Sequence, residues 1–299
     1  MLSKDILDCY LKAGSIASEV RQEARTLIKE DASLLQICEH VENSIRGKGG
    51  EPAFPCNICI NDIAAHYSSP PKDMTKIPQN AVVKLDLGVQ VDGYVADTAM
   101  TVSLSSQYEN MVFAVNEVLE QVIKNVRPKA KIDELGRTIQ RAIANFGFKP
   151  IRNLSGHQMS RYILHTGKSI PNVSDLSFQS INEDEIYAIE PFLTFTSARG
   201  EVRNGNYEYI YRFQKERRVD STQAAQLLTQ IKTNFKFLPF SPRWIKEIEF
   251  KGTLNAFNLL VEKRCVSSYP VLVEASGNIV AQAEHTVIVT RDGCIVTTR

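Results

Sequence analysis

Four acidic residues lie inside apolar stretches of the sequence, where carboxylates are rare. They are Asp86 in VVKLDLGV, Asp97 in GYVADTAM, Glu190 in IYAIEPF and Glu284 in VAQAEHTVIV. Aspartate is depleted in strands, and a buried ionised carboxylate is costly unless a partner neutralises it. One such residue commonly points to solvent, but four of them in separate apolar strands require a shared explanation.

Two of these acids belong to one predicted hairpin. An Asp-Gly pair at positions 92 and 93 is a strong signal for a two-residue turn. With that turn, Asp97 lies opposite Gly88, and Asp86 lies opposite Ala99. Because side chains alternate along a strand, Asp86 and Asp97 become diagonal neighbours on one face. Carboxylates this close require either that one is protonated, as in an acid dyad, or that a cation lies between them.

Histidines supply candidate nitrogen ligands for such a cation. His157 follows Gly156 in NLSGHQ, and this glycine would allow backbone and metal to approach closely. His165 follows eight positions later, and His66 precedes the hairpin in NDIAAHY. Two other histidines are not expected to be ligands, since one lies in a surface helix pattern and the other points away from Glu284: His40 and His285.

The metal interpretation is favoured because the chain offers further acids and an imidazole. Four carboxylates and one imidazole form a hard to borderline ligand set, which suits Mn, Fe, Co or Zn rather than a thiolate site or a structural zinc. Bridging carboxylates favour two divalent metal ions per chain, as in aminopeptidases, where such a pair activates a water molecule for hydrolysis.

Hydrophobic periodicity predicts the elements that must position these residues. One helix covers residues 4–29, and a second starts near Asp31 as its N-cap and ends at the glycines of RGKGG. Residues 52–80 are rich in Pro, Asn and Ser and are predicted to be mainly loop and short strand. The remaining elements are helices at 107–126 and 132–146, strands at 82–104, 186–195 and 279–289, and a helical segment at 219–268. The order helix, helix, strands occurs twice, which is consistent with two similar halves around one sheet.

The composition is that of an ordinary globular chain. Its 299 residues are 43% hydrophobic and carry a formal net charge of +1, which gives no support to binding of nucleic acid or a membrane surface. No segment predicts a signal peptide or a membrane span, and six cysteines do not indicate a disulfide scaffold. We therefore expect a reduced, cytoplasmic protein. The CNIC pair, Cys56 and Cys59, lacks the second pair that a structural zinc needs.

The strings that carry these residues resemble the successive motifs of methionine aminopeptidases with the pita-bread fold. They are AFPCNICIND, AAHY, KLDLGVQVDGYVADTA, SGHQ, LHTG, AIEPF and AQAEHTVIV, and the resemblance runs from about residue 3 to residue 296. It implies an α+β fold in which a pseudo-twofold antiparallel sheet is covered by helices, as a single catalytic domain over residues 1–299. The stretch LPFSPRWI resembles the helical insert of type II enzymes, which implies an insert subdomain at about 205–272. Because the chain begins almost at once with the first helix, it resembles the archaeal type II form.

The resemblance implies how the five ligands hold two metal ions. Asp86 would bind one ion through both carboxylate oxygens. Asp97 and Glu284 would bridge the two ions. His157 and Glu190 would complete the shell of the second ion.

It also implies the catalytic and substrate-binding residues. Glu190 would act as general base, taking a proton from the attacking water and passing it to the leaving amine. His165 would stabilise the tetrahedral oxyanion, and His66 would position the substrate. Phe54 would form a hydrophobic wall around the methionine side chain.

The implied activity is removal of the initiator methionine from nascent proteins and peptides, with a small second residue preferred. The family resemblance further implies a monomer that contacts the ribosome transiently. Relatives commonly have serine and valine where this chain has Cys59 and Cys56, which raises the prospect of thiol oxidation near the pocket mouth.

Two alternative functions stay open at this point. A related pita-bread peptidase that cuts X-Pro bonds would use the same five ligands, although this chain lacks the separate N-terminal domain of those enzymes. A non-catalytic binding protein on the same fold is the second alternative. Such proteins typically lose ligands, whereas this sequence keeps all five together with His66 and His165.

Overall fold

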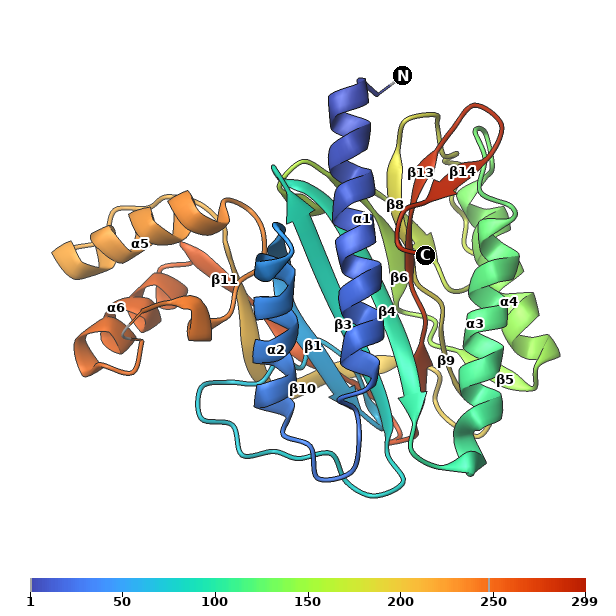
Figure 1. Ribbon diagram of the computed structural model, residues 1–299, viewed down its shortest axis with the longest axis horizontal. Coiled ribbons are helices and arrows are strands. Elements are labelled where there is room, and N and C mark those ends of the chain that lie inside the picture. Colours follow the sequence, from blue (N-terminus) through green and yellow to red (C-terminus); the bar gives the residue numbers. More distant parts are fainter. Residues whose placement is uncertain (1, 247) are drawn as a thin grey trace.

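Two pairs of helices cover antiparallel strands, which makes the fold α+β (Figure 1). The computed structural model describes residues 2–246 and 248–299. In the first half, the helices α1 (Lys4–Arg25) and α2 (Leu34–Gly47) lie over a sheet with the order β1-β3-β4 (Figure 1). These strands are β1 (Glu51–Ile60), β3 (Val82–Val91) and β4 (Tyr94–Ser103), and the short β2 (Ile63–Ala65) follows β1.

The second half repeats this arrangement with α3 (Glu109–Ile123), which follows the 3-10 turn η1 (Ser106–Tyr108), and α4 (Ile132–Asn145). A five-stranded sheet has the order β14-β13-β8-β6-β7, and a three-stranded sheet has the order β12-β9-β5. The strands of these two sheets are β5 (Phe148–Pro150), β6 (Ser155–Ser160), β7 (Ile163–Pro171), β8 (Ile186–Ile189), β9 (Phe192–Phe195), β12 (Val280–Gln282), β13 (His285–Val289) and β14 (Cys294–Val296).

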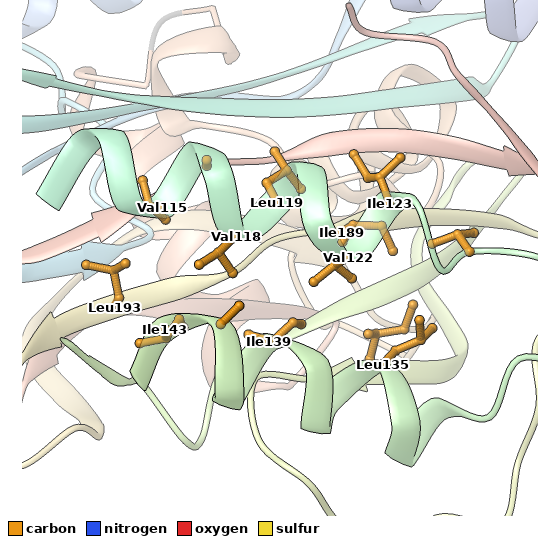
Figure 2. Close-up of a cluster of buried hydrophobic side chains, with 14 of the residues drawn as sticks. Val115, Val118, Leu119, Val122, Ile123, Leu135, Ile139, Ile143, Ile189 and Leu193 are labelled. Carbon is orange, nitrogen blue, oxygen red and sulfur yellow. The ribbon is translucent and has the colours of Figure 1, made fainter. Parts of the chain in front are cut away.

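The largest buried cluster joins the second helix pair to its sheets. Figure 2 shows Val118 and Val122 of α3 facing Ile139 of α4, with Ile189 and Leu193 from the strands beside them. The predicted spacing of apolar residues along both helices therefore becomes the core of this half. Gly147, with a φ of 79°, follows the C-cap residue Phe146 and ends α4 in the left-handed conformation that favours glycine.

A third region projects from one side of the molecule (Figure 1). The long strands β10 (Val202–Phe213) and β11 (Val266–Glu274) pair antiparallel, and β2 joins β11. Between them the chain forms α5 (Thr222–Phe235), the short η2 (Pro242–Trp244) and α6 (Lys251–Glu262), which pack around their own apolar cluster. The helical segment predicted at 219–268 is thus too long, because its last residues belong to β11.

Two other predicted boundaries were wrong. The N-cap of α2 is Ser33, whose hydroxyl accepts from the Gln36 amide, whereas Asp31 has a φ of 59° and donates its N–H to the Ile77 carbonyl. Residues 51–60 form the ten-residue strand β1, which is longer than the short strand predicted within 52–80. Its prolines are tolerated because β1 is an edge strand with irregular register.

The predicted register of the first hairpin is confirmed. Asp97 pairs with Gly88, and Asp86 pairs with Ala99. The turn residues Asp92 and Gly93 have φ values of 52° and 84°, as a two-residue turn of type I′ requires. Among the described helices, none combines the length and the hydropathy needed to cross a membrane.

Candidate metal centre

The five predicted ligands all line one cavity of about 420 Å³. Asp86 comes from β3, Asp97 from β4 and His157 from β6. Glu190 lies in the break between β8 and β9, and Glu284 immediately precedes β13. Each half of the fold therefore contributes ligands, and the cavity lies where the halves meet.

Strand interruptions and cross-strand contacts place the acids. Pro191 has no N–H to donate to a strand ladder, and the strand breaks at Glu190. Glu284 exchanges backbone hydrogen bonds with Ala99, at 3.1 and 3.4 Å. Because Ala99 is also the strand partner of Asp86, this backbone pairing places Glu284 beside Asp86.

Three of the ligands form a compact group. One ligand atom from each of Asp97, His157 and Glu284 lies within 4.8 Å of the others. The Nε2 atom of His157 is 3.6 Å from Asp97 Oδ2 and 3.6 Å from Glu190 Oε1. Gln282 extends its amide toward Glu190 and Glu284, with Nε2–Oε2 distances of 3.5 and 3.4 Å.

Burial makes the charged forms of these carboxylates unfavourable. It raises the pKa of Asp86 to about 7. Burial and neighbouring carboxylates together raise the pKa values of Asp97, Glu190 and Glu284 well above their ordinary range. Burial also lowers the pKa of His157, which keeps its imidazole neutral and able to bind a metal.

These residues fit a divalent cation. Asp86 Oδ1 and Asp97 Oδ1 are buried without a hydrogen-bond partner among the described residues. A buried polar atom without a partner is costly, so a ligand is expected at both oxygens. Oxygen and imidazole donors are the set that Mn, Fe, Co and Zn accept. Of the two options that the sequence left open, the cation explains all five residues, whereas a shared proton explains only the two aspartates.

The other two predicted histidines line the same cavity, and Tyr269 lies between them. The His66 ring meets the Tyr269 ring edge-on, with centroids 5.6 Å apart, and His66 Nδ1 lies 3.2 Å from the Pro270 carbonyl oxygen. The His165 ring centroid is 4.1 Å from that of His157. Burial lowers the pKa of His66 and lowers that of His165 to about 4, so both rings are neutral near pH 7.

Phe54 lines the cavity from β1, opposite Gly88 of β3. A Cβ atom at position 88 would overlap the Phe54 ring. The glycine that follows Asp86 by two positions therefore makes room for the Phe54 ring beside the cavity.

Gly156 lets the backbones of β6 and β8 approach closely, because a Cβ atom there would overlap the Ala188 carbonyl oxygen. One sequence-based expectation about neighbouring residues was wrong. Cys56 and Cys59 do not lie at the pocket mouth. Both are buried, neither belongs to the lining of the cavity, and burial raises the pKa of Cys59 to about 12.

The two histidines that were expected not to be ligands lie outside the cavity lining. His285 has its Nδ1 atom 2.8 Å from the Thr298 hydroxyl. His40 is exposed on α2. Gln282 and Tyr269 were not predicted. The position of Gln282 could have indicated it, because it precedes Glu284 by two and the side-chain period of a strand is two. Tyr269 carried no such signal.

A mixed fold that gathers four carboxylates and a buried histidine in one accessible cavity, with Asp97 and Glu284 also buried, fits the class of metal-dependent hydrolases. The chain belongs to metallopeptidase family M24, whose pattern matches residues 8–291. It is 48% identical to a methionine aminopeptidase of Methanocaldococcus jannaschii over 289 residues, which cover 97% of each chain.

Solved structures identify the fold as the pita-bread fold that the sequence predicts. A thermophilic Arx1 superposes with a TM-score of 0.87 at 15% identity, covering 99% of this chain and 91% of the other. A methionine aminopeptidase from Thermotoga maritima gives a TM-score of 0.72 at 18% identity, covering 100% of this chain and 98% of the other. Identities this low establish the fold alone.

Proposed function

We propose that this chain removes the initiator methionine from nascent proteins and peptides by metal-dependent hydrolysis of the first peptide bond, preferring a small second residue. The observation that carries the proposal is the convergence of five metal-binding side chains in one cavity. The high identity to an archaeal methionine aminopeptidase over nearly the full length of both chains supports it.

Two divalent ions, of Co, Mn, Fe or Zn, would be held by the five ligands. In this assignment Asp86 would hold one ion, Asp97 and Glu284 would be shared by both, and His157 and Glu190 would hold the second. The proximity of Asp97, His157 and Glu284 supports a shared position for these three. When bound, such ions polarise the scissile carbonyl and lower the pKa of a water molecule.

Glu190 is the proposed general base. Its carboxylate lines the cavity, with Oε1 3.6 Å from His157 Nε2, so it lies beside the other proposed metal-binding residues. It would take a proton from the attacking water and pass it to the leaving amine.

The neutral histidines have separate proposed roles. His165 would donate a hydrogen bond to the oxyanion, and its pKa of about 4 keeps it uncharged while doing so. His66 would orient the substrate from its fixed place against Tyr269 and Pro270. Phe54 would contact the methionine side chain. We assign all three as substrate-binding residues, with His66 and His165 also catalytic.

We further propose a single catalytic domain over residues 1–299 with a type II helical insert at about 205–272. The projection of α5 and α6 from the β10–β11 pair supports the insert (Figure 1). A cytoplasmic monomer with transient ribosome contact remains our expectation from the family resemblance.

A peptide comparison tests the proposed function. The protein loaded with Mn or Co should hydrolyse Met-Ala-Ser much faster than Ala-Pro peptides, measured by release of the free N-terminal amino acid. Faster cleavage of the Ala-Pro peptides would instead assign the chain to the X-Pro peptidases. Loss of activity after chelation, and its return with metal, controls for a contaminating peptidase.

A further inference from the structure

A buried ion pair connects the helical region around α5 and α6 to the first half of the fold. Arg243 of η2 donates from Nη1 and Nη2 to the two carboxylate oxygens of Glu42 on α2, each at 2.8 Å. Only 6% of the Arg243 side chain and 3% of the Glu42 side chain are exposed. Trp244 adds a third donor, from its Nε1 to Glu42 Oε2 at 2.7 Å.

The fourth donor to this carboxylate is the backbone of the strand that carries Phe54. The Cys56 amide donates to Glu42 Oε1 at 3.2 Å. One helical turn before Glu42, the Cys38 thiol donates to the Cys56 carbonyl at 3.4 Å. Side chains four positions apart share one helix face, so α2 binds both backbone groups of Cys56.

Cys56 lies at an irregularity that changes which side chains face the cavity. Along β1, Phe54 pairs with Gly88 and Asn57 pairs with Asp86. Three positions on β1 therefore span two on β3, which is the pattern of a β-bulge with one extra residue. Residues three apart on a regular strand face opposite sides, yet Phe54 and Asn57 both line the cavity.

We propose that Glu42, held by Arg243 and Trp244, is a positioning residue for the substrate pocket. It fixes the bulge at Cys56 and thereby sets where Phe54 stands in the cavity. Through this ion pair, the helical region controls selection of the first side chain of the substrate. The identity of that side chain as methionine rests on the proposed function.

The energetics of buried charge support a positional role. Desolvation of two ions offsets most of their attraction, so a buried pair is a weak source of net stability. Here the four donors occupy both oxygens of Glu42, which leaves the carboxylate one orientation. The hydrogen bond to Cys56 then transmits that orientation to β1.

The substitution Glu42→Gln tests this proposal with almost no change in volume. Each carboxylate oxygen of Glu42 accepts from two of the four donors, so the NH2 group of a glutamine must face two other donors. We expect hydrogen exchange at the Cys56 amide to accelerate at least ~10-fold. With Met-Ala-Ser, we expect KM to rise about 10-fold while kcat changes less than about 2-fold, because the substitution alters binding of the side chain and not the chemistry.

A double-mutant cycle with Phe54→Ala tests whether Glu42 affects KM by positioning Phe54 or by a general loss of rigidity in the protein. If Glu42 acts through Phe54, then Glu42→Gln should raise KM far less in the Phe54→Ala background than in the wild type. Equal fold-changes in the two backgrounds would overturn the proposal. Trp244→Phe, which removes a single donor, should give a smaller effect of the same kind, and it replaces Glu42→Gln if that variant does not fold.

Glu249→Gln is the matched control. Glu249 pairs with Lys72 on the surface, so this substitution also removes an ion pair between the helical region and the rest of the protein. It should leave KM and hydrogen exchange at the Cys56 amide unchanged. If Glu249→Gln changed both as much as Glu42→Gln does, loss of any ion pair to the helical region would explain the result, and the specific role of Glu42 would be refuted. The exchange measurement needs no turnover. An unchanged Cys56 amide would therefore refute the positioning role, whereas absence of methionine release by the wild type would refute only the proposed function.

Discussion

At the scale of single residues, the site buries more negative charge than the surrounding protein neutralises. Arg21 is a buried cation whose charge acts on Glu284, yet its guanidinium donates to the Thr98 hydroxyl rather than to a carboxylate. Four carboxylates with raised pKa values remain. Without metal, the folded protein must therefore hold protons there that the unfolded chain would release.

This proton uptake predicts how pH affects the metal-free protein. Asp86 has a pKa of about 7 when folded and an ordinary value of 3.8, so the folded state binds its proton more tightly. The stabilising effect is complete below the unfolded value and is lost as pH rises through the folded value. The metal-free protein should be more stable near pH 5 than near pH 8, by about 3 kcal/mol from Asp86 alone.

Chemical denaturation of the chelator-treated protein at the two pH values measures this difference. The Asp86→Asn variant is the control, because it removes the titrating carboxyl group and should flatten the pH dependence. Greater stability of the metal-free wild-type protein near pH 8 would contradict the prediction.

Replacement of the proposed base Glu190 should abolish turnover while the protein stays folded. Glu190→Ala is expected to lower kcat by at least about 10²–10⁴, the usual contribution of a positioned acid or base. The group of Asp97, His157 and Glu284 remains, so metal should still bind. Steady-state kinetics and metal analysis check both points. A rate equal to that of the wild type would remove Glu190 from the mechanism.

At the scale of elements, the positions of the ligands depend on how closely strands approach. β6 carries His157, and it pairs with β8 in a register that sets His157 beside Ala188. Gly156 permits this approach, because any larger residue would meet the Ala188 carbonyl. The metal site is thus sensitive to a residue that binds nothing itself.

Gly156→Ala should therefore destabilise the protein and weaken metal binding together. Overpacking of this kind typically costs about 1–3 kcal/mol. Thermal unfolding and a metal titration provide the two measurements. The control is Gly47→Ala at the end of α2, where a Cβ atom would meet no described atom within 4 Å and stability should stay unchanged or rise slightly. Equal unfolding temperatures and equal metal affinities of the two variants would show that the close approach of β6 and β8 does not determine metal binding.

At the scale of the whole molecule, bound metal would join the two halves. Asp86 and Asp97 come from the first half, and His157 and Glu190 come from the second. Glu284 follows β12 and belongs to the chain that returns after the helical region, with its backbone paired to Ala99 of the first half. Binding at this place should stabilise the fold as one unit.

Metal loading is accordingly expected to raise the temperature of a single cooperative unfolding transition. A ligand at 100 times its dissociation constant contributes about 2.7 kcal/mol, which for a chain of this size shifts the midpoint by roughly 5 °C. Differential scanning calorimetry with and without chelator measures the shift. Two separate transitions, of which only one responds to metal, would show that the halves are not joined.

The sequence by itself determined the local structure on which the site depends. The Asp-Gly turn and strict side-chain alternation were enough to place Asp86 and Asp97 on one face, because a two-residue turn leaves a single register. The four acids in apolar strands also indicated a metal, since burial of unpaired carboxylates is unfavourable in any fold. Turn residues, side-chain alternation and residue type each involve only a few neighbouring positions, so the sequence alone reveals them.

Only the tertiary structure decided what depends on contacts between distant segments. It showed that β1 is a bulged strand whose Cys56 amide donates to Glu42, that Cys56 and Cys59 are buried, and that Gly156 allows the Ala188 carbonyl to approach. The sequence could not indicate these features, because each partner is far along the chain and residue type alone does not specify which backbone group will approach. The register shift that brings both Phe54 and Asn57 to the cavity arises in the pairing of β1 with β3, and local periodicity does not indicate it.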